Sequence, residues 1–267
     1  MKKKQLISTL LLLSLGIILL SGKPIAVSAD DSKEGNASIE LEAFPEEQGI
    51  RDPENPETIT DPGPSPSTEG RLRIDFAPQL NFGQYAITDN DMSYPVNAQL
   101  FKDKTGPRGN FIQVSDFREG RQGWSLQIRQ ESQFKNEHAK NTELNGAVIS
   151  FDKSWVNSTR EQSEAPIVSK EIIRLSNIGE TYNLAEAKKD TGFGIWSISF
   201  GASADNKNGQ AATLTPRLLK DKPVLDPSFD NQQVYENNAI TLSVPGATKR
   251  DPVQYSTVLT WIIAELP

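Results

Sequence analysis

The sequence predicts an all-β domain that begins near residue 70. From Gly70 onward, short runs of β-branched, aromatic and alternating residues are separated by Gly, Asn, Asp and Pro every ten to fifteen residues or so, which is typical of strands and turns. The segment from Gly123 to Ile128 alternates strictly, as a half-buried strand does. We therefore expect an antiparallel sandwich or barrel, with an immunoglobulin-like sandwich as one option, at most one short helix, and a disordered arm in front.

Each expected element follows from a local pattern. The Asn145-Gly146 and Asn208-Gly209 pairs predict hairpins, because Asn and Gly readily adopt the positive φ values of a type I′ turn. Residues 183–189 are mostly good helix formers, but the segment is too short to define an architecture. In chain order, the expected strands are residues 71–76, 84–88, 96–101, 111–117, 123–130, 146–151, 194–201, 239–244 and 255–266.

The first 29 residues have the pattern of a secretory signal peptide. Three lysines at positions 2–4 precede an almost unbroken apolar run over residues 6–20, and small residues lead up to Ala29. The apolar run is shorter than the roughly 20 residues that a transmembrane helix needs. We expect cleavage after Ala29 and secretion of a mature chain that begins at Asp30.

The negative charge is concentrated in the segment that follows the signal. The formal net charge of the chain is −7, and removal of the four signal lysines takes it to −11. Residues 30–69 account for −10 of this and are rich in Pro, Glu, Ser and Thr, so we expect a disordered, semi-stiff linker. Residues 70–267 form the β domain, and their charge of −1 argues against binding to nucleic acid or anionic lipid.

The composition also limits the chemistry that the chain could perform. There is no cysteine, which excludes disulfides, thiolate metal sites and thiol catalysis. His138 is the one histidine and lies in a polar segment, which favours a solvated loop over a catalytic base. We expect no enzyme activity, no cofactor and no metal. Paired carboxylates of a glycan hydrolase cannot be recognised from spacing, so a hydrolase stays as a weak alternative.

Two segments that contain tryptophan have the pattern of strands. In residues 123–128, Trp124 and Leu126 share one face with Ile128, which indicates one buried face. Residues 255–266 carry apolar side chains on both faces, which suggests a central strand that is covered on both sides. A third segment, residues 194–198, alternates in the same way and predicts that Trp196 lies in the core.

The segments around Trp124 and Trp261 resemble the two signatures of the WxL family of low-GC Gram-positive bacteria. The resemblance rests on Trp124-Ser125-Leu126 and on a C-terminal segment with Tyr255, Leu259, Trp261 and Ile263, where Ile263 replaces the usual leucine. It extends to the proline-rich entry and to residues 74–78 and 80–83. It implies a secreted protein whose C-terminal domain attaches non-covalently to peptidoglycan. The chain ends without a sorting signal, so we expect no covalent anchoring.

The resemblance leaves the contact residues and the partner open. Exposed tryptophan faces suit sugar C–H groups, but tryptophan is highly buried on average, which favours a packing role. We expect the two signature strands to lie side by side. The implied partners are peptidoglycan or another wall polymer, other WxL proteins and a WxL-interacting surface protein. The alternative function is a protein-interaction module that assembles with surface proteins or binds host extracellular matrix.

Overall fold

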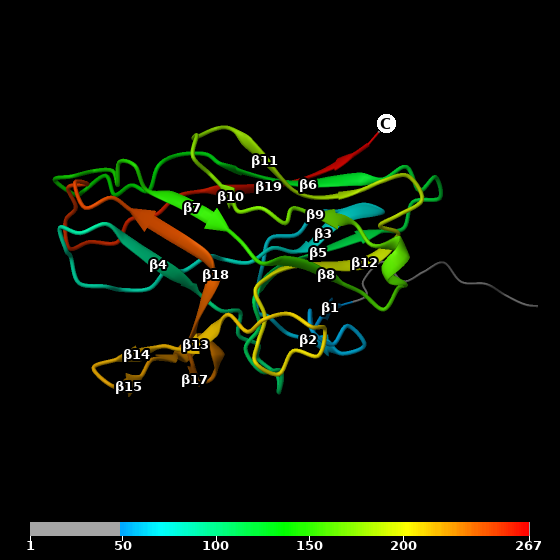
Figure 1. Cartoon of the computed structure of the whole chain (residues 1–267), viewed down its shortest axis with the longest axis horizontal. Coiled ribbons are helices and arrows are strands. Elements are labelled where there is room, and N and C mark those ends of the chain that lie inside the picture. The colour runs from blue at the N-terminus through cyan, green and yellow to red at the C-terminus, as the bar shows by residue number, and fades with distance from the viewer. Residues whose placement is uncertain (1–48, 267) are drawn as a thin grey trace, which may run out of the picture. The chain divides into compact units, whose positions relative to one another are not determined.

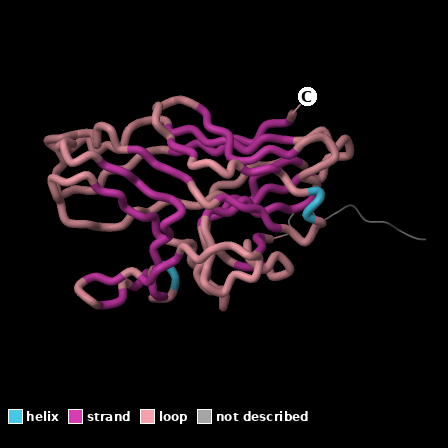
Figure 2. Tube along the Cα trace, in the orientation of Figure 1, coloured by secondary structure: helices cyan, strands magenta, loops and turns pink. Residues whose placement is uncertain are grey.

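The computed structural model describes residues 49–266. The expected signal peptide and residues 30–48 of the expected linker lie outside the described residues. Figure 2 shows that strands and loops make up nearly all of the described chain. The prediction of an all-β antiparallel fold is confirmed, and the strands form several open sheets rather than a closed barrel.

Three antiparallel sheets make up most of the fold (Figure 1). One has the order β10-β7-β18-β13 with β4 also paired to β18, the second has the order β19-β6-β11-β9, and the third has the order β3-β5-β12-β8. Their strands are β3 (Leu72–Phe76), β4 (Met92–Asn97), β5 (Asn110–Asp116), β6 (Trp124–Gln130), β7 (Val148–Phe151), β8 (Ser154–Asn157), β9 (Ile167–Val168), β10 (Ile173–Arg174), β11 (Thr181–Ala187), β12 (Gly194–Phe200), β13 (Leu214–Pro216), β18 (Tyr235–Val244) and β19 (Leu259–Glu265).

Short ribbons and turns complete the described chain. The two-stranded ribbons are β1 (Ile50–Arg51) with β2 (Ile59–Thr60), β14 (Leu218–Leu219) with β15 (Lys222–Pro223), and β16 (Leu225–Asp226) with β17 (Gln232–Gln233). Two 3₁₀ turns, η1 (Gln162–Glu164) and η2 (Pro227–Phe229), are the helical elements of residues 49–266.

A single large apolar cluster joins the three main sheets. It contains Trp196, which is fully buried as the alternation of its strand predicts, together with Ile112, Leu126, Ile149 and Leu242. A smaller cluster of Phe76, Phe101 and Phe111, with Ile50 packed against it, lies on the other face of β5, because successive residues of a strand point to opposite faces. The β3-β5 sheet is therefore covered on both faces.

The expected disorder of the linker is wrong for residues 49–69. Arg51 donates its backbone N–H to the side chain of Gln113 (2.7 Å), and Asp52, only 3% exposed, forms a two-point ion pair with Arg108 (2.8 and 2.9 Å). The backbone N–H of Ser203 donates to the carboxylate of Glu54 at 2.7 Å. The segment has no apolar core of its own, but polar contacts with the outer face of the β3-β5 sheet order it.

Further along this segment, the carboxylate of Asp103 fixes residues 60 and 61 through hydrogen bonds. Asp103 accepts from the backbone N–H of Asp61 (2.6 Å) and of Thr105 (2.7 Å) and from the hydroxyl of Thr60 (2.8 Å). Desolvation alone would raise the pKa of Asp103, but the hydrogen bonds from Thr105, Thr60 and Asp61 outweigh it and lower the pKa to about 2. The ordered domain thus begins well before Gly70.

Three local predictions are also wrong. Residues 183–189 are not helical, because β11 is hydrogen-bonded to β6 on one side and to β9 on the other, and these ladders override helix propensity. Residues 84–88 form no strand, since β4 takes the edge of β18 instead. The strand expected at residues 96–101 lies earlier, at Met92–Asn97.

Neither Asn-Gly pair forms the expected type I′ hairpin. Gly146 and Gly209 have positive φ values of 78° and 71°, but neither Asn145 nor Asn208 does, and a type I′ turn needs both. Residues 144–147 still form a turn, closed by the 3.0 Å bond from Ala147 N–H to the Leu144 carbonyl. The type I′ geometry occurs instead between β14 and β15, where Lys220 and Asp221 both have positive φ.

Candidate functional site

The first tryptophan segment forms the centre of its sheet. β6 pairs with β11 on one side and with β19 on the other, and Trp124 and Leu126 are 0% exposed. The indole N–H of Trp124 donates to the backbone carbonyl of Gly192 at 3.1 Å. Gly192 is required here, because a Cβ at this position would lie 2.7 Å from the indole nitrogen and 2.3 Å from the Cβ of Ala187. Trp124 and Leu126 cannot touch a polymer in this fold.

The second segment pairs with the first, as expected, but at a different place in the sheet. Ile263 lies opposite Leu126, Trp261 opposite Ile128 and Leu259 opposite Gln130. The expectation of a central strand is wrong, because β19 is the edge strand of the order β19-β6-β11-β9. The face with Leu259, Trp261 and Ile263 packs against the large apolar cluster, so the apolar pattern of β19 does not report pairing at both edges.

The side chains of the second signature are only partly buried. Tyr255, Leu259, Trp261 and Ile263 pack against the large apolar cluster without being enclosed by it. The ring of Trp261 meets that of Phe151 edge-on, with centroids 6.3 Å apart. These residues are thus the part of the two signatures that stays partly exposed.

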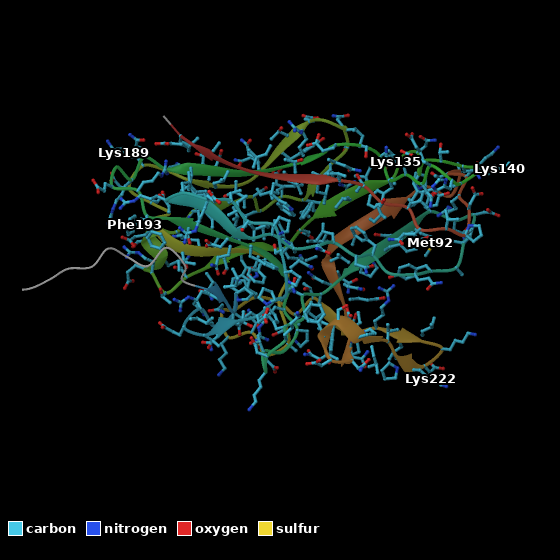
Figure 3. The ribbon with its side chains drawn as sticks, turned by 180° about the vertical axis from the view of Figure 1, so that it is seen from behind. Met92, Lys135, Lys140, Lys189, Phe193 and Lys222 are labelled. Atoms are coloured by element: carbon cyan, nitrogen blue, oxygen red, sulfur yellow. The ribbon has the colours of Figure 1, made fainter. Side chains whose placement is uncertain are left out.

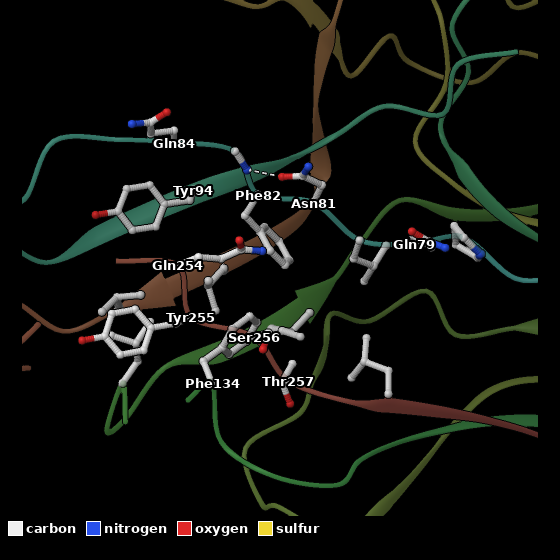
Figure 4. A pocket seen from close by; sticks show the side chains of 18 of the residues that line it. Gln79, Asn81, Phe82, Gln84, Tyr94, Phe134, Gln254, Tyr255, Ser256 and Thr257 are labelled. Carbon is white, nitrogen blue, oxygen red and sulfur yellow. Dashed lines mark hydrogen bonds between the residues drawn. The ribbon is translucent and has the colours of Figure 1, made fainter. Parts of the chain in front are cut away.

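A groove of about 1320 Å³ opens beside β19. Its walls come from residues between 66 and 87, from the continuous segment of residues 250–257 and 259–261, and from individual side chains of β4, β7, β18 and residues 134 and 144. Figure 4 shows the rings of Phe82, Tyr94, Phe134 and Tyr255 gathered at one end. Exposed polar side chains also line the groove, among them Gln79, Gln84, Gln254 and Ser256.

The aromatic end is built around Tyr85, which is 39% exposed. Its ring packs on that of Tyr94, with centroids 4.6 Å apart, and the guanidinium of Arg217 lies 4.7 Å from its centroid. Its hydroxyl donates to the carboxylate of Glu236 at 3.2 Å. Partial burial, opposed by Arg217 and assisted by Glu236, raises the pKa of Tyr85 to about 12. Tyr85 therefore presents a neutral, positioned ring to the groove.

Tyr255 is fixed by hydrogen bonds to its own loop and to residue 141. Its hydroxyl donates to the carbonyl of Asn141 (2.7 Å) and accepts from the backbone N–H of Asp251 (2.9 Å). Asp251 accepts from the backbone and side-chain amides of Asn141 at 2.7 and 2.8 Å, and these bonds lower the pKa of its carboxyl. The loop that carries Tyr255 is thus clamped to residues 136–142.

The sequence interpretation missed most of this aromatic end. Tyr85, Tyr94 and Phe134 come from segments without a recognised motif, although the stretch of residues 80–83 was part of the resemblance. Within this stretch, Gly83 is the residue with a clear structural requirement. It has φ +77°, and a Cβ at this position would lie 1.9 Å from the guanidinium of Arg217. The glycine lets Arg217 reach Tyr85, and that close approach is the physical signal in this stretch.

Other candidate features give no catalytic geometry. His138 is exposed, as expected for a solvated loop. Within residues 49–266, no group of three or more His, Cys, Asp or Glu side chains is placed to hold a metal ion. Lysines are spread over the domain, with Lys189 and Lys140 at opposite ends of it in Figure 3. The groove is the candidate site, because it brings residues of the second signature together with aromatic and amide side chains.

Comparison with known proteins gives a family match. Over residues 49–266, no helix is long and apolar enough to cross a membrane. No match was found among curated proteins or among solved structures. The family model described as "WxL domain surface cell wall-binding" matches residues 28–267. Because this match covers most of the sequence, the chain belongs to the WxL family of surface cell wall-binding domains.

Proposed function

We propose that this protein is secreted, has no catalytic activity and attaches non-covalently to peptidoglycan at the cell surface through its WxL domain. The family match over residues 28–267 carries the proposal, since the family is described as surface cell wall-binding. Secretion rests on the lysines and the apolar run of residues 1–29, with a mature chain from Asp30.

The groove is the proposed wall contact. Aromatic faces pack against sugar C–H groups, and side-chain amides exchange hydrogen bonds with hydroxyl and acetamido groups. The aromatic end offers Tyr85 and Tyr255, and Gln84 and Gln254 supply amides beside them. Of the signature residues, Tyr255, Leu259 and Trp261 line the groove. Trp124, Leu126 and Ile263 hold the sheet that positions them.

A protein-interaction module is the second candidate, and the free edge of β19 favours it. Unpaired strand edges recruit extended segments of other chains. In this case the partners would be other WxL proteins, a WxL-interacting surface protein or host matrix, and attachment to the wall would be indirect.

Co-sedimentation of the purified mature chain with insoluble Gram-positive peptidoglycan tests the proposal. Ile87 lines the groove and is 49% exposed, whereas Ile167 is 57% exposed on β9, at the other edge of the sheet that contains β19. We expect wild type and Ile167→Asp to sediment and Ile87→Asp to remain in solution. Equal sedimentation of both variants would refute the groove as the contact. Wild type that sediments only with a partner protein would favour the interaction module.

A further inference from the structure

The edge of β19 that faces away from β6 carries unpaired backbone groups. The Val258 carbonyl accepts from Glu131 N–H (2.9 Å), and Leu266 N–H donates to the Gly123 carbonyl (3.3 Å), so these two residues turn their backbone groups toward the β6 side. In an antiparallel pair this orientation alternates along the strand. The N–H and C=O groups of Leu259, Trp261 and Ile263 therefore point to the free edge.

This edge lacks the devices that protect other edge strands of the described chain. β3 is interrupted by a bulge between Ile74 and Phe76 and is capped by the bond from Thr68 N–H to the Ile74 carbonyl. β4 contains Pro95, and β8, β9, β10 and β13 have four residues or fewer. β19 has seven residues in unbroken register with β6 and no Lys or Pro. Such an edge is a template for another strand.

The groove provides room for the side chains of an added strand. Next to β19 it is lined by Ile74, Ala77 and Leu80, and the side chains of Leu259 and Trp261 form the adjoining wall. An added strand would place alternate side chains over these residues, since successive side chains point to opposite faces. The free edge of β19 and the adjoining groove, together called the acceptor, therefore fit a segment of about seven residues with apolar residues at every second position.

The chain contains such a segment outside the described residues. Residues 38–44 read Ser-Ile-Glu-Leu-Glu-Ala-Phe, in which the apolar residues Ile39, Leu41 and Ala43 alternate with Glu40 and Glu42. Seven extended residues span about 23 Å, the same as the seven residues of β19. The segment matches the acceptor in length and in pattern.

The place where the chain enters the described fold favours a second copy as the donor. The carbonyl of Gly49 accepts from the side chain of Gln113 (3.1 Å), and Ile50 packs with Phe76 and Phe111. This is the face of β5 opposite to Ile112 and Val114, which share the large apolar cluster with β19. Only four residues separate position 44 from Gly49, and the edge of β3, between this entry point and β19, is already capped. We therefore expect the segment to pair with β19 of another copy and not with its own.

We propose that residues 38–44 of one copy of the chain pair with the free edge of β19 in a second copy, so that copies join head to tail by strand addition. Such a contact is heterologous and repeats from copy to copy, which produces a closed ring or an open chain of copies. The pairing uses the backbone of β19 and would cover Leu259 and Trp261, whereas the aromatic end of the groove, with Tyr85 and Tyr255, stays available to the wall. The inference therefore does not depend on wall binding.

Oligomeric mass and hydrogen exchange of the mature chain test the proposal together. Leu41→Asn places a polar residue on the apolar face of the segment, and Glu42→Asn places the same residue on its polar face. We expect wild type and Glu42→Asn to form larger species as concentration rises, and Leu41→Asn to stay monomeric. In the assembled state, the amides of Leu259, Trp261 and Ile263 should exchange at least about tenfold more slowly than in Leu41→Asn.

The amides of Thr260, Ile262 and Ala264, which face β6, serve as the internal control because they should exchange slowly in every variant. Wild type that stays monomeric with fast exchange at Trp261 and Ile263 would overturn the proposal. So would an assembly that persists in Leu41→Asn. Slow exchange at these two residues in a monomer, independent of concentration, would overturn the assignment to a second copy.

Discussion

β6 and β19 carry the two signature segments and pair over seven residues, yet they lie in different environments. β6 is hydrogen-bonded on both sides, and Trp124 and Leu126 are fully buried. β19 is bonded on one side, and Trp261 is partly buried at a groove. A similar sequence pattern is thus fully buried in one strand and lines a groove in the other.

Replacing each tryptophan by alanine should separate the two roles by stability. Trp124→Ala leaves a cavity in the centre of the sheet and removes the bond to Gly192, so we expect a loss of about 3 to 5 kcal/mol. Trp261→Ala removes a side chain that already contacts solvent, and the expected loss is about 1 to 2 kcal/mol. Urea unfolding followed by circular dichroism measures both values. Equal losses would show that the contrast between the two strands is false.

The support of Trp124 can be tested without changing the tryptophan. Gly192→Ala forces a Cβ against Ala187 and the Trp124 indole at φ +72°, and we expect a loss of about 2 to 3 kcal/mol. Gly209 has nearly the same φ, +71°, but open space around it, so Gly209→Ala should cost only about 1 kcal/mol of backbone strain. The difference in the free energy of unfolding isolates the contact with Trp124, and no difference would contradict that contact.

The sequence predicted the environment of β6 better than that of β19, for a physical reason. Alternation of side chains reports which faces of a strand are covered, and Trp124, Leu126 and Ile128 share the buried face that this pattern indicates. Pairing at an edge depends on backbone groups, which are the same for every residue except proline. Apolar residues on both faces of β19 therefore could not reveal its free edge.

The groove and the ordered part of the linker could not be predicted for a related reason. Tyr85, Phe134 and Tyr255 line one groove only after the fold brings segments far apart in sequence together. The composition of residues 49–69 is that of a disordered segment. The order of this segment comes from contacts with Arg108 and Gln113 in the domain, which its own composition does not reveal. The chemistry of one segment does not report the partner that it meets.

The smallest expected effect concerns a polar contact that ties β19 to the chain beyond β6. The hydroxyl of Thr260 donates to the carboxylate of Glu131, and this bond, with help from Arg129, lowers the pKa of that carboxyl below its ordinary value of 4.5. A lowered pKa in the folded state contributes stability above the ordinary value, and this contribution is lost as pH falls through the lowered pKa. Thr260→Val should therefore lower the Tm slightly at pH 6 and less at pH 3.

Thr181 is the matched control, because Thr181 and Thr260 lie opposite Arg129 on its two neighbouring strands. Thr181→Val lies on β11, away from the free edge, and its effect on the Tm should not change between pH 6 and pH 3. A pH-independent effect of Thr260→Val would show that the bond to Glu131 does not hold β19. In that case β19 would be retained by the β6 ladder and its apolar face alone, and its free edge would be no less stable in acid.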